Sequence, residues 1–266
     1  MDFAVKYGPW AIVAGGSEGP GLEYSRQIAA RGVNVLIVAH EQEPLDEASA
    51  LIRSESQAEV VTALIDLNAP DADRQIIAAA GSREVGLYIS NAGGDASGRK
   101  FHDADVQWWI DLATRNNLTM LKCFHHFGGL MKARGRGGLL ISGSGACYGG
   151  GPHLAMYCAV KAFSLNFAEG LWAELKPHGV NVLCMVMDRT DTKLLRGLLA
   201  KTGAQMPPDV AKPADVAAAG LARLAHGPVS NWGLDDEEAG WAGTSAAHRR
   251  VRVEAIAENT RDMYAD

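Results

Sequence analysis

Cysteine is scarce in this sequence, and the few copies form no familiar motif. The chain contains Cys123, Cys147, Cys158 and Cys184, with no Cys-x-x-Cys pair and no histidine at the spacing of a metal ligand. This spacing argues against zinc motifs and against a disulfide framework. We therefore expect reduced thiols in a cytoplasmic protein and no metal site.

Positive charge is also in short supply. Lys and Arg number 25 against 31 Asp and Glu, and the formal net charge is −6. A nucleic-acid-binding protein carries a basic footprint, so we expect no nucleic-acid partner. The basic cluster at residues 248–252 follows an acidic run at 235–238, and we interpret the cluster as a solvated helix face.

Long hydrophobic runs are missing as well. The longest apolar stretches are too short to span a bilayer, and they break at glycine or charged residues. The N-terminal residues do not have the form of a signal peptide. We expect neither a membrane span nor a signal peptide.

Glycine and apolar residues are abundant: the 266 residues include 30 glycines, and 47% are hydrophobic. This length suits one α/β domain over residues 1–266. The predicted strands cover residues 10–14, 33–39, 60–66, 85–90, 139–142, 180–187 and 229–232, and the predicted helices cover 22–31, 44–54, 71–80, 105–133 and 156–176. The strands are apolar almost throughout, which is typical of a parallel sheet covered on both faces. The alternation predicts a doubly wound α/β fold.

Residues 188–213 interrupt this alternation. They contain Arg, Thr, Lys and Gly residues and the pair Pro207-Pro208. The excursion follows the carboxyl end of a predicted strand, where a lid over a binding site would lie.

The first predicted strand ends in a glycine-rich turn, Gly15-Gly16-Ser17-Glu18-Gly19-Pro20-Gly21. Glycines permit a tight turn and a close approach of the backbone to a pyrophosphate, and the following helix offers free N–H groups and its positive dipole end. Pro20 is tolerated because the first helical turn has no N–H bond to lose. A glycine run alone fits a simple turn. Between the first strand and first helix of a doubly wound sheet, it predicts a nucleotide site.

Two further strand ends are candidates for the same site. Asp66 and Leu67 follow the third predicted strand. Asp66 either borders an adenine or acts as the N-cap of the next helix, and both interpretations stay open. Asn91, Ala92 and Gly93 close the fourth strand, where they can lock the strand end and let a cofactor approach the backbone.

Tyr157 and Lys161 are four positions apart, so they share one face of a predicted helix. A positive charge beside a phenol stabilises the phenolate, which favours the proton exchange that a carbonyl/alcohol reaction needs. Ser144 lies upstream, after the fifth predicted strand. Taken alone, the Tyr-Lys pair also fits an ordinary amphipathic helix.

The glycine turn, Asn91-Ala92-Gly93, Ser144 and Tyr157-x-x-x-Lys161 occur in the order that is typical of one family. Together they resemble the short-chain dehydrogenase/reductase family over about residues 7–192. Segments 7–13, 17–24, 142–145 and 191–194 look like the branch of very-long-chain 3-oxoacyl-CoA reductases and 17β-hydroxysteroid dehydrogenases.

The resemblance implies a Rossmann-type fold and a catalytic tetrad of Asn117, Ser144, Tyr157 and Lys161. Asn116 is the less suitable candidate for the asparagine. In this mechanism Ser144 donates a hydrogen bond to the carbonyl oxygen, and Tyr157 transfers the proton. Lys161 holds the nicotinamide ribose, and Asn117 anchors a water that links Lys161 to solvent.

The resemblance also implies that Thr190 and Thr192 contact the nicotinamide end of the cofactor. The sequence departs from the family pattern in three places. Ala14 replaces a Thr, Pro20 replaces an Ile, and Met187-Asp188 replaces the Pro-Gly that usually follows the sixth strand. The last change alters the backbone beside the expected nicotinamide.

The residues that close the second strand bear on the choice between NAD and NADP. Ala39 occupies the position of the carboxylate that selects NAD by binding the ribose 2′-OH. His40 stands where similar NADP enzymes often carry Arg, and it can donate to a phosphate. Glu41 argues the other way, and Glu18 is not decisive. We favour NADP(H), with NAD(H) as the alternative.

Gly150, His153 and the 188–213 excursion are expected to line the substrate site. Met187 and Leu194, with further leucines of the excursion, suggest an apolar pocket, although the leucines also fit one face of a packed helix and His153 an ordinary loop. An apolar site suits a hydrophobic ketone or secondary alcohol, such as a steroid, a 3-oxoacyl thioester or an aryl ketone.

Two functions follow from these observations. The favoured one is an NADP(H)-dependent oxidoreductase, and the other is a catalytically silent dinucleotide-binding sensor or scaffold. The intact set of Ser144, Tyr157 and Lys161 favours the enzyme. By resemblance we also expect a homodimer or homotetramer, with the predicted helices 105–133 and 156–176 as the candidate interface.

Overall fold

The computed structural model describes residues 2–94, 99–151, 153–203, 205–238, 245–251 and 254. Its centre is a parallel sheet of seven strands in the order β3-β2-β1-β4-β5-β6-β7. The strands are β1 (Trp10–Ala14), β2 (Asn34–Ala39), β3 (Val60–Leu64), β4 (Val85–Ser90), β5 (Gly137–Ser144), β6 (Val180–Met187) and β7 (Val229–Asn231). The predicted doubly wound parallel sheet is confirmed.

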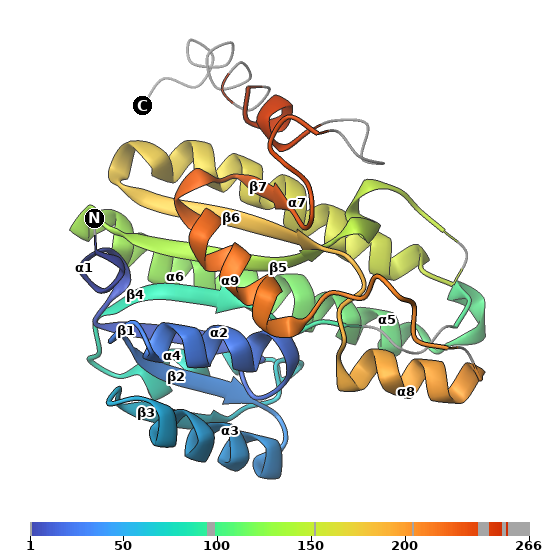
Figure 1. The fold of residues 1–266 in the computed structure, drawn as a ribbon, viewed down its shortest axis with the longest axis horizontal. Coiled ribbons are helices and arrows are strands. Elements are labelled where there is room, and N and C mark those ends of the chain that lie inside the picture. Colours follow the sequence, from blue (N-terminus) through green and yellow to red (C-terminus); the bar gives the residue numbers. More distant parts are fainter. Residues whose placement is uncertain are drawn as a thin grey trace.

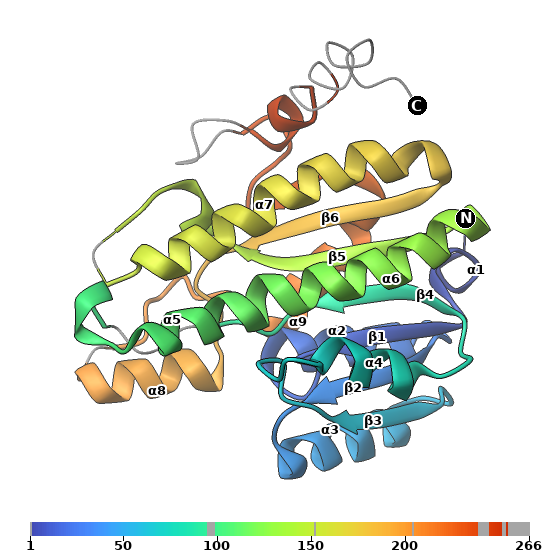
Figure 2. The ribbon, with the colours of Figure 1, turned by 180° about the vertical axis from the view of Figure 1, so that it is seen from behind.

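Helices cover both faces of the sheet (Figures 1 and 2). The helices are α1 (Phe3–Tyr7), α2 (Gly19–Ala29), α3 (Gln42–Glu55), α4 (Ala72–Ala80), α5 (Val106–Ala113), α6 (Thr119–Arg134), α7 (Ala155–Leu175), α8 (Lys193–Thr202) and α9 (Pro213–Arg223). Figure 1 shows α2, α3 and α9 on one face, and Figure 2 shows α4, α6 and α7 on the other. Within the described part of the chain, no helix combines the length and apolar character that a bilayer span needs.

The two faces explain why the strands are apolar without alternation. Along β1, Trp10, Ile12 and Ala14 pack in the core beneath α4, α6 and α7, whereas Ala11 and Val13 pack beneath α2, α3 and α9. Successive side chains of a strand point to opposite faces, so burial on both faces requires apolar residues at every position.

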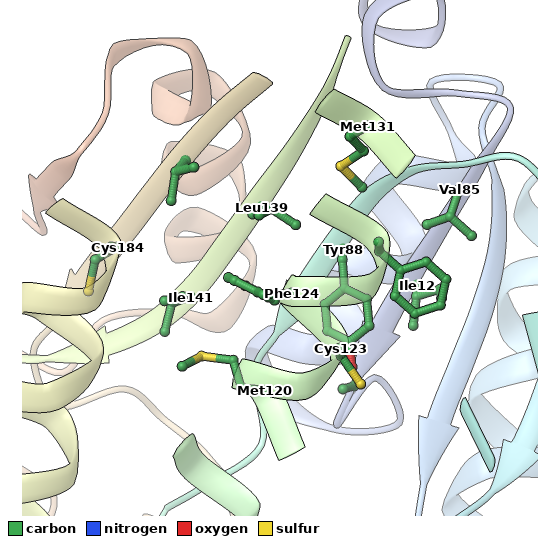
Figure 3. Packing of buried hydrophobic residues seen from close by; sticks show 14 of the residues in the cluster. Ile12, Val85, Tyr88, Met120, Cys123, Phe124, Met131, Leu139, Ile141 and Cys184 are labelled. Carbon is green, nitrogen blue, oxygen red and sulfur yellow. The ribbon is translucent and has the colours of Figure 1, made fainter. Parts of the chain in front are cut away.

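Figure 3 shows the core beneath α6, where aromatic rings meet. The Phe124 ring lies 5.5 Å from the Tyr88 ring in an edge-on arrangement, and Phe127 lies 5.5 Å from the same tyrosine. Such pairs add to the burial of apolar area. They join α6 to the central strand β4.

Most predicted elements are confirmed with small shifts at their ends, and two expectations are wrong. The helix predicted over residues 105–133 is divided into α5 and α6 by the π-helical turn η2 (Thr114–Leu118). The 188–213 excursion contains the helix α8, which agrees with the alternative that its leucines lie on a helix, and the α9 helix, absent from the predicted helices, follows it. Arg249 of the basic cluster is buried, at 7% exposure, and is not on a solvated face.

The site is positioned by the order of the strands. From β1 the chain adds β2 and then β3 on one side. It then crosses back and adds β4 on the other side of β1. Ligands of doubly wound sheets bind in the crevice at the carboxyl ends of strands where the order reverses. In Figure 1 the strand arrows point toward the end of the sheet where α5 and α8 lie.

The core beneath α6 gives a test of the packing. We expect Phe124→Ala to lower the free energy of unfolding by about 3–5 kcal/mol, because it leaves a cavity against Tyr88. The matched control Phe163→Ala should cost less than about 1 kcal/mol, since Phe163 is 40% exposed. Chemical denaturation measures both, and equal losses would contradict the packing described.

Candidate active site

The turn between β1 and α2 approaches its neighbours so closely that it requires glycine. Gly15 has a φ of +79°, and a Cβ there would lie 2.7 Å from the Ala92 nitrogen. A Cβ on Gly21 would clash with the Gly15 carbonyl oxygen. Residues 15–21 therefore form a tight cradle at the carboxyl end of β1, with no room for a larger side chain at Gly15 or Gly21.

The N-terminus of α2 opens onto this cradle. Glu18 is the N-cap residue, and its side chain makes no capping hydrogen bond, while Pro20 lies in the first turn. The first N–H groups and the positive dipole end are thus available to an anion. This donor set fits the pyrophosphate of a dinucleotide.

Asn91, just after β4, holds the cradle in place. Its Nδ2 donates to the Gly15 carbonyl at 2.9 Å, and its Oδ1 accepts from Ser142 Oγ at 2.8 Å. The Ala92 N–H donates to the Ala14 carbonyl at 3.0 Å. One amide side chain therefore ties together the carboxyl ends of β1, β4 and β5.

Ser144 and the Tyr157-Lys161 pair come from neighbouring elements. Ser144 ends β5, and its Oγ accepts from the Ala146 N–H at 3.3 Å in the 3₁₀ turn η3 (Gly145–Tyr148). Tyr157 and Lys161 lie on the first turns of α7. Lys161 is 5% exposed, and its Nζ donates to the Ser142 carbonyl at 3.1 Å. The same Nζ lies 5.7 Å from the centre of the Tyr157 ring.

The π-helical turn η2 directs two adjacent asparagines inward. Asn117 Nδ2 donates to the Val160 carbonyl at 3.0 Å and to Ser164 Oγ at 3.2 Å, both on α7. Asn116 Nδ2 donates back to the Leu112 carbonyl at 2.8 Å. A regular α-helix would turn neighbouring side chains about 100° apart, and the extra residue of a π turn relaxes that constraint. Asn117 is thus fastened to α7 at the residue before Lys161.

A cavity of about 860 Å³ joins these parts. Most of the predicted site residues line it: Gly15, Ser17, Glu18, Gly19, Pro20, His40, Asp66, Leu67, Asn91, Ala92, Gly93, Ser144, Tyr157, Lys161, Met187, Thr190, Thr192 and Leu194. Gly21 and Asn117 support the wall from behind. Gly150 and His153 are exposed and are not among the lining residues.

One end of this cavity is lined by the polar residues His40 and Asp66. The His40 side chain is 71% exposed, with its Nε2 3.4 Å from Glu41 Oε1. Asp66 Oδ1 accepts from the Asn68 N–H at 2.9 Å, whereas the N-cap of α4 is Asp71. The interpretation of Asp66 as the N-cap of the next helix is therefore wrong.

Helix α8 covers the other side of the glycine turn. Thr192 is its N-cap, with Oγ1 accepting from the Leu195 N–H at 3.2 Å. Lys193 Nζ lies 3.1 Å from Glu18 Oε1, and this carboxylate raises the pKa of the Lys193 ammonium, so it stays charged at neutral pH. The 188–213 excursion therefore contacts the glycine turn directly.

Sequence analysis missed several lining residues. Trp108, Asp111 and Arg115 reach the cavity from α5 and η2. Trp108 is 40% exposed, a property that the sequence alone does not show. Leu195 and Leu198 of the excursion line the cavity from α8, as the apolar-pocket interpretation of these leucines predicted. No three His, Cys, Asp or Glu side chains among the described residues lie close enough together to hold a metal ion.

The comparison with family models decides the classification, because the short chain dehydrogenase model matches residues 9–202. The chain belongs to the short-chain dehydrogenase family. The predicted resemblance and the predicted enzyme class, an oxidoreductase, are both confirmed. Members of this family bind NAD(P), which agrees with the cradle at the β1–α2 turn.

Named relatives include two kinds of enzyme. A 7β-hydroxysteroid dehydrogenase of Clostridium sardiniense is 31% identical over 192 residues, which cover 72% of this chain and 73% of that protein. A very-long-chain 3-oxoacyl-CoA reductase of Podospora anserina is 34% identical over 182 residues, which cover 66% of this chain and 53% of that protein. The reductase belongs to the predicted branch, whereas the hydroxysteroid relative acts at position 7β rather than 17β.

Solved structures share the fold of this family member. One from a study of 7β-hydroxysteroid dehydrogenase stereoselectivity has a TM-score of 0.81 and 24% identity, covering 96% of this chain and 100% of that one. A short-chain dehydrogenase from Sphingobium yanoikuyae in complex with NADPH has a TM-score of 0.79 and 24% identity, covering 97% and 98% of the two chains.

The Asn91 bridge provides a test of the cradle. We expect Asn91→Ala to raise the Kd for the dinucleotide by about tenfold, because a lost hydrogen bond that leaves partners unsatisfied costs about 1–3 kcal/mol. Isothermal titration measures this Kd. Asn166→Ala is the control, since Asn166 is exposed on α7 and bonds only within its helix. An unchanged Kd in Asn91→Ala would contradict the role of the bridge.

Proposed function

We propose that the protein is an oxidoreductase that transfers a hydride between NADP(H) and a hydrophobic ketone or secondary alcohol. One observation carries the proposal: Ser144, Tyr157 and Lys161 line the same cavity as the glycine turn at the end of β1. A carbonyl group between these hydroxyls and the bound dinucleotide would meet both a hydrogen-bond donor and a proton donor. That is the arrangement which carbonyl reduction requires.

A nicotinamide dinucleotide bound here would supply the hydride. Ser144 donates a hydrogen bond to the carbonyl oxygen, where negative charge develops. Tyr157 delivers a proton to the same oxygen, or removes one in the oxidative direction. Lys161 would hold the ribose hydroxyls of the dinucleotide. Asn117 is our candidate to anchor a water beside Lys161, and Thr190 and Thr192 to border the nicotinamide end.

The preference for NADP(H) over NAD(H) rests on the charges at the adenosine end. Ala39 provides no carboxylate to repel a 2′-phosphate, and His40 is exposed to the cavity. Lys193 adds a cation that sequence analysis did not identify. It bonds to Glu18 and also interacts electrostatically with Glu41 and Glu43, so it offsets the acidic groups that oppose a phosphate.

The apolar wall supports a hydrophobic substrate. Leu154 and Leu194 are 41% and 47% exposed and line the cavity with Met187, Leu195 and Leu198. Small-molecule sites are mostly apolar, with a few well-placed polar groups. The relatives that act on hydroxysteroids and 3-oxoacyl thioesters favour these two substrate classes over aryl ketones.

The alternative, a silent sensor or scaffold, is not favoured. A protein that only binds a dinucleotide has no chemical need for Ser144 and Tyr157 beside the binding cradle. The homodimer or homotetramer and the cytoplasmic location remain predictions, which size-exclusion chromatography with light scattering and cell fractionation would test.

Replacing the proton donor tests the mechanism. We expect Tyr157→Phe to lower kcat by about 10²–10⁴-fold, the usual contribution of general acid catalysis, while the dinucleotide still binds. NADPH oxidation with steroid, 3-oxoacyl thioester, aryl and small aliphatic ketones measures it. Retained turnover in the variant would refute the role of Tyr157, and no turnover by the wild type despite tight NADPH binding would favour the silent protein.

Replacing Lys193 tests the cofactor preference. We expect Lys193→Ala to raise the Kd for NADPH by about tenfold at low salt, the usual effect of losing a charge-assisted contact, and to leave the Kd for NADH unchanged. Lys201→Ala, in the last turn of the same helix, is the control. Equal weakening of both dinucleotides would show that Lys193 acts only by holding the lid.

A further inference from the structure

An ion pair with little exposure joins the C-terminal segment (residues 245–251) to helix α7. Arg249 Nε bonds to Glu169 Oε1, and the two side chains are only 8% and 7% exposed. Removing two charges from water is costly, so a buried pair is weak evidence for stability. The role of such a pair is better inferred from the structural elements that it joins.

Arg249 also contacts the turn that follows Ser144. Its guanidinium lies over the Tyr148 ring, 5.6 Å from the centre. Tyr148 ends the η3 turn, and its hydroxyl donates to Asn231 Oδ1 at 2.6 Å. The adjacent Cys147 side chain is buried, at 8% exposure, so this region is shielded from water. Contacts of a charge are stronger where water is excluded.

Glu169 lies on the same helix as the reacting groups. Tyr157, Lys161 and Glu169 all belong to α7, and Glu169 follows Lys161 by eight residues, a little more than two turns. The η3 turn packs against the same helix. Arg249 therefore connects two parts of the structure. One is the turn that begins directly after Ser144, and the other is the helix that carries Tyr157 and Lys161.

We propose that Arg249 is a positioning residue, which fixes the Ser144 hydroxyl relative to Tyr157 by clamping Tyr148 of η3 against Glu169 of α7. The inference rests on the proposed function, in which Ser144 and Tyr157 act on one carbonyl oxygen. The segment that carries Arg249 has other anchors. Arg250 bonds to Asp236 Oδ2 at 3.0 Å and to the Gly227 carbonyl at 2.8 Å, so loss of Arg249 alone leaves the segment attached.

A double variant separates positioning from stability. Arg249→Met removes the guanidinium that the buried Glu169 carboxylate bonds to, so we expect both the unfolding midpoint Tm and kcat to fall. Arg249→Met with Glu169→Leu replaces the pair by apolar residues, a change that is often neutral or stabilising. We expect this double variant to recover the wild-type Tm while kcat remains lower by about ten- to a hundredfold, the effect of a misplacement on the order of 1 Å. The dinucleotide Kd should stay at the wild-type value in both.

Two more variants complete the test. Tyr148→Leu keeps the ion pair but removes the ring beneath Arg249, and we expect the same loss of kcat. Lys176→Met removes an exposed pair between η4 (Lys176–His178) and Glu254, and we expect no change in Tm or kcat.

Recovery of kcat together with Tm in the double variant, or wild-type kcat in Tyr148→Leu, would overturn the positioning role. If the wild-type enzyme is active, either of these results leaves the proposed function intact. Absence of turnover in the wild type itself would overturn both.

Discussion

The site depends on one close contact, between the turn after β1 and the end of β4. The strand order reverses at this point, so no crossover helix fills the space above it. The contact is possible because Gly15 and Gly21 have no Cβ, and it is held by Asn91, which bonds to both Gly15 and Ser142. Through Ser142 the same amide reaches the strand that ends in Ser144. The glycine turn and the strand end that carries Ser144 are thus fixed by one short network.

The second constraint is the buried ammonium of Lys161. At 5% exposure it needs partners in the protein, and the Ser142 carbonyl is the acceptor it bonds to. Ser142 therefore supports the site twice, with its hydroxyl bound to Asn91 and its carbonyl bound to Lys161. This arrangement sets the carboxyl end of β5 against the first turns of α7.

Local patterns predicted most of the fold, because they depend on residues close in sequence. The apolar runs of β1, β4 and β6 gave their boundaries, and the glycine turn and the Tyr157-Lys161 spacing led to the cavity. The parts that were missed depend on distant partners. The π turn at Asn116 and Asn117 is held by α7, more than forty residues away. Arg249 is buried only because Glu169 meets it across eighty positions. Leu194, Leu195 and Leu198 of α8 line the cavity, as the apolar-pocket interpretation predicted.

The replacement of the family Pro-Gly by Met187-Asp188 has a physical compensation in the structure. Asp188 Oδ1 accepts from the Arg189 N–H at 2.7 Å, and its carbonyl accepts from Thr190 Oγ1 at 3.0 Å. Side-chain bonds of this kind stabilise a turn in place of a fixed proline ring. Thr190 then pairs with Ala211, which closes the base of the excursion. The chain leaves β6 in a defined direction, Thr192 begins α8 beside Gly19, and Lys193 reaches Glu18. The hydrogen bonds of Asp188 and the pairing of Thr190 with Ala211 therefore define the backbone where the family usually has Pro-Gly.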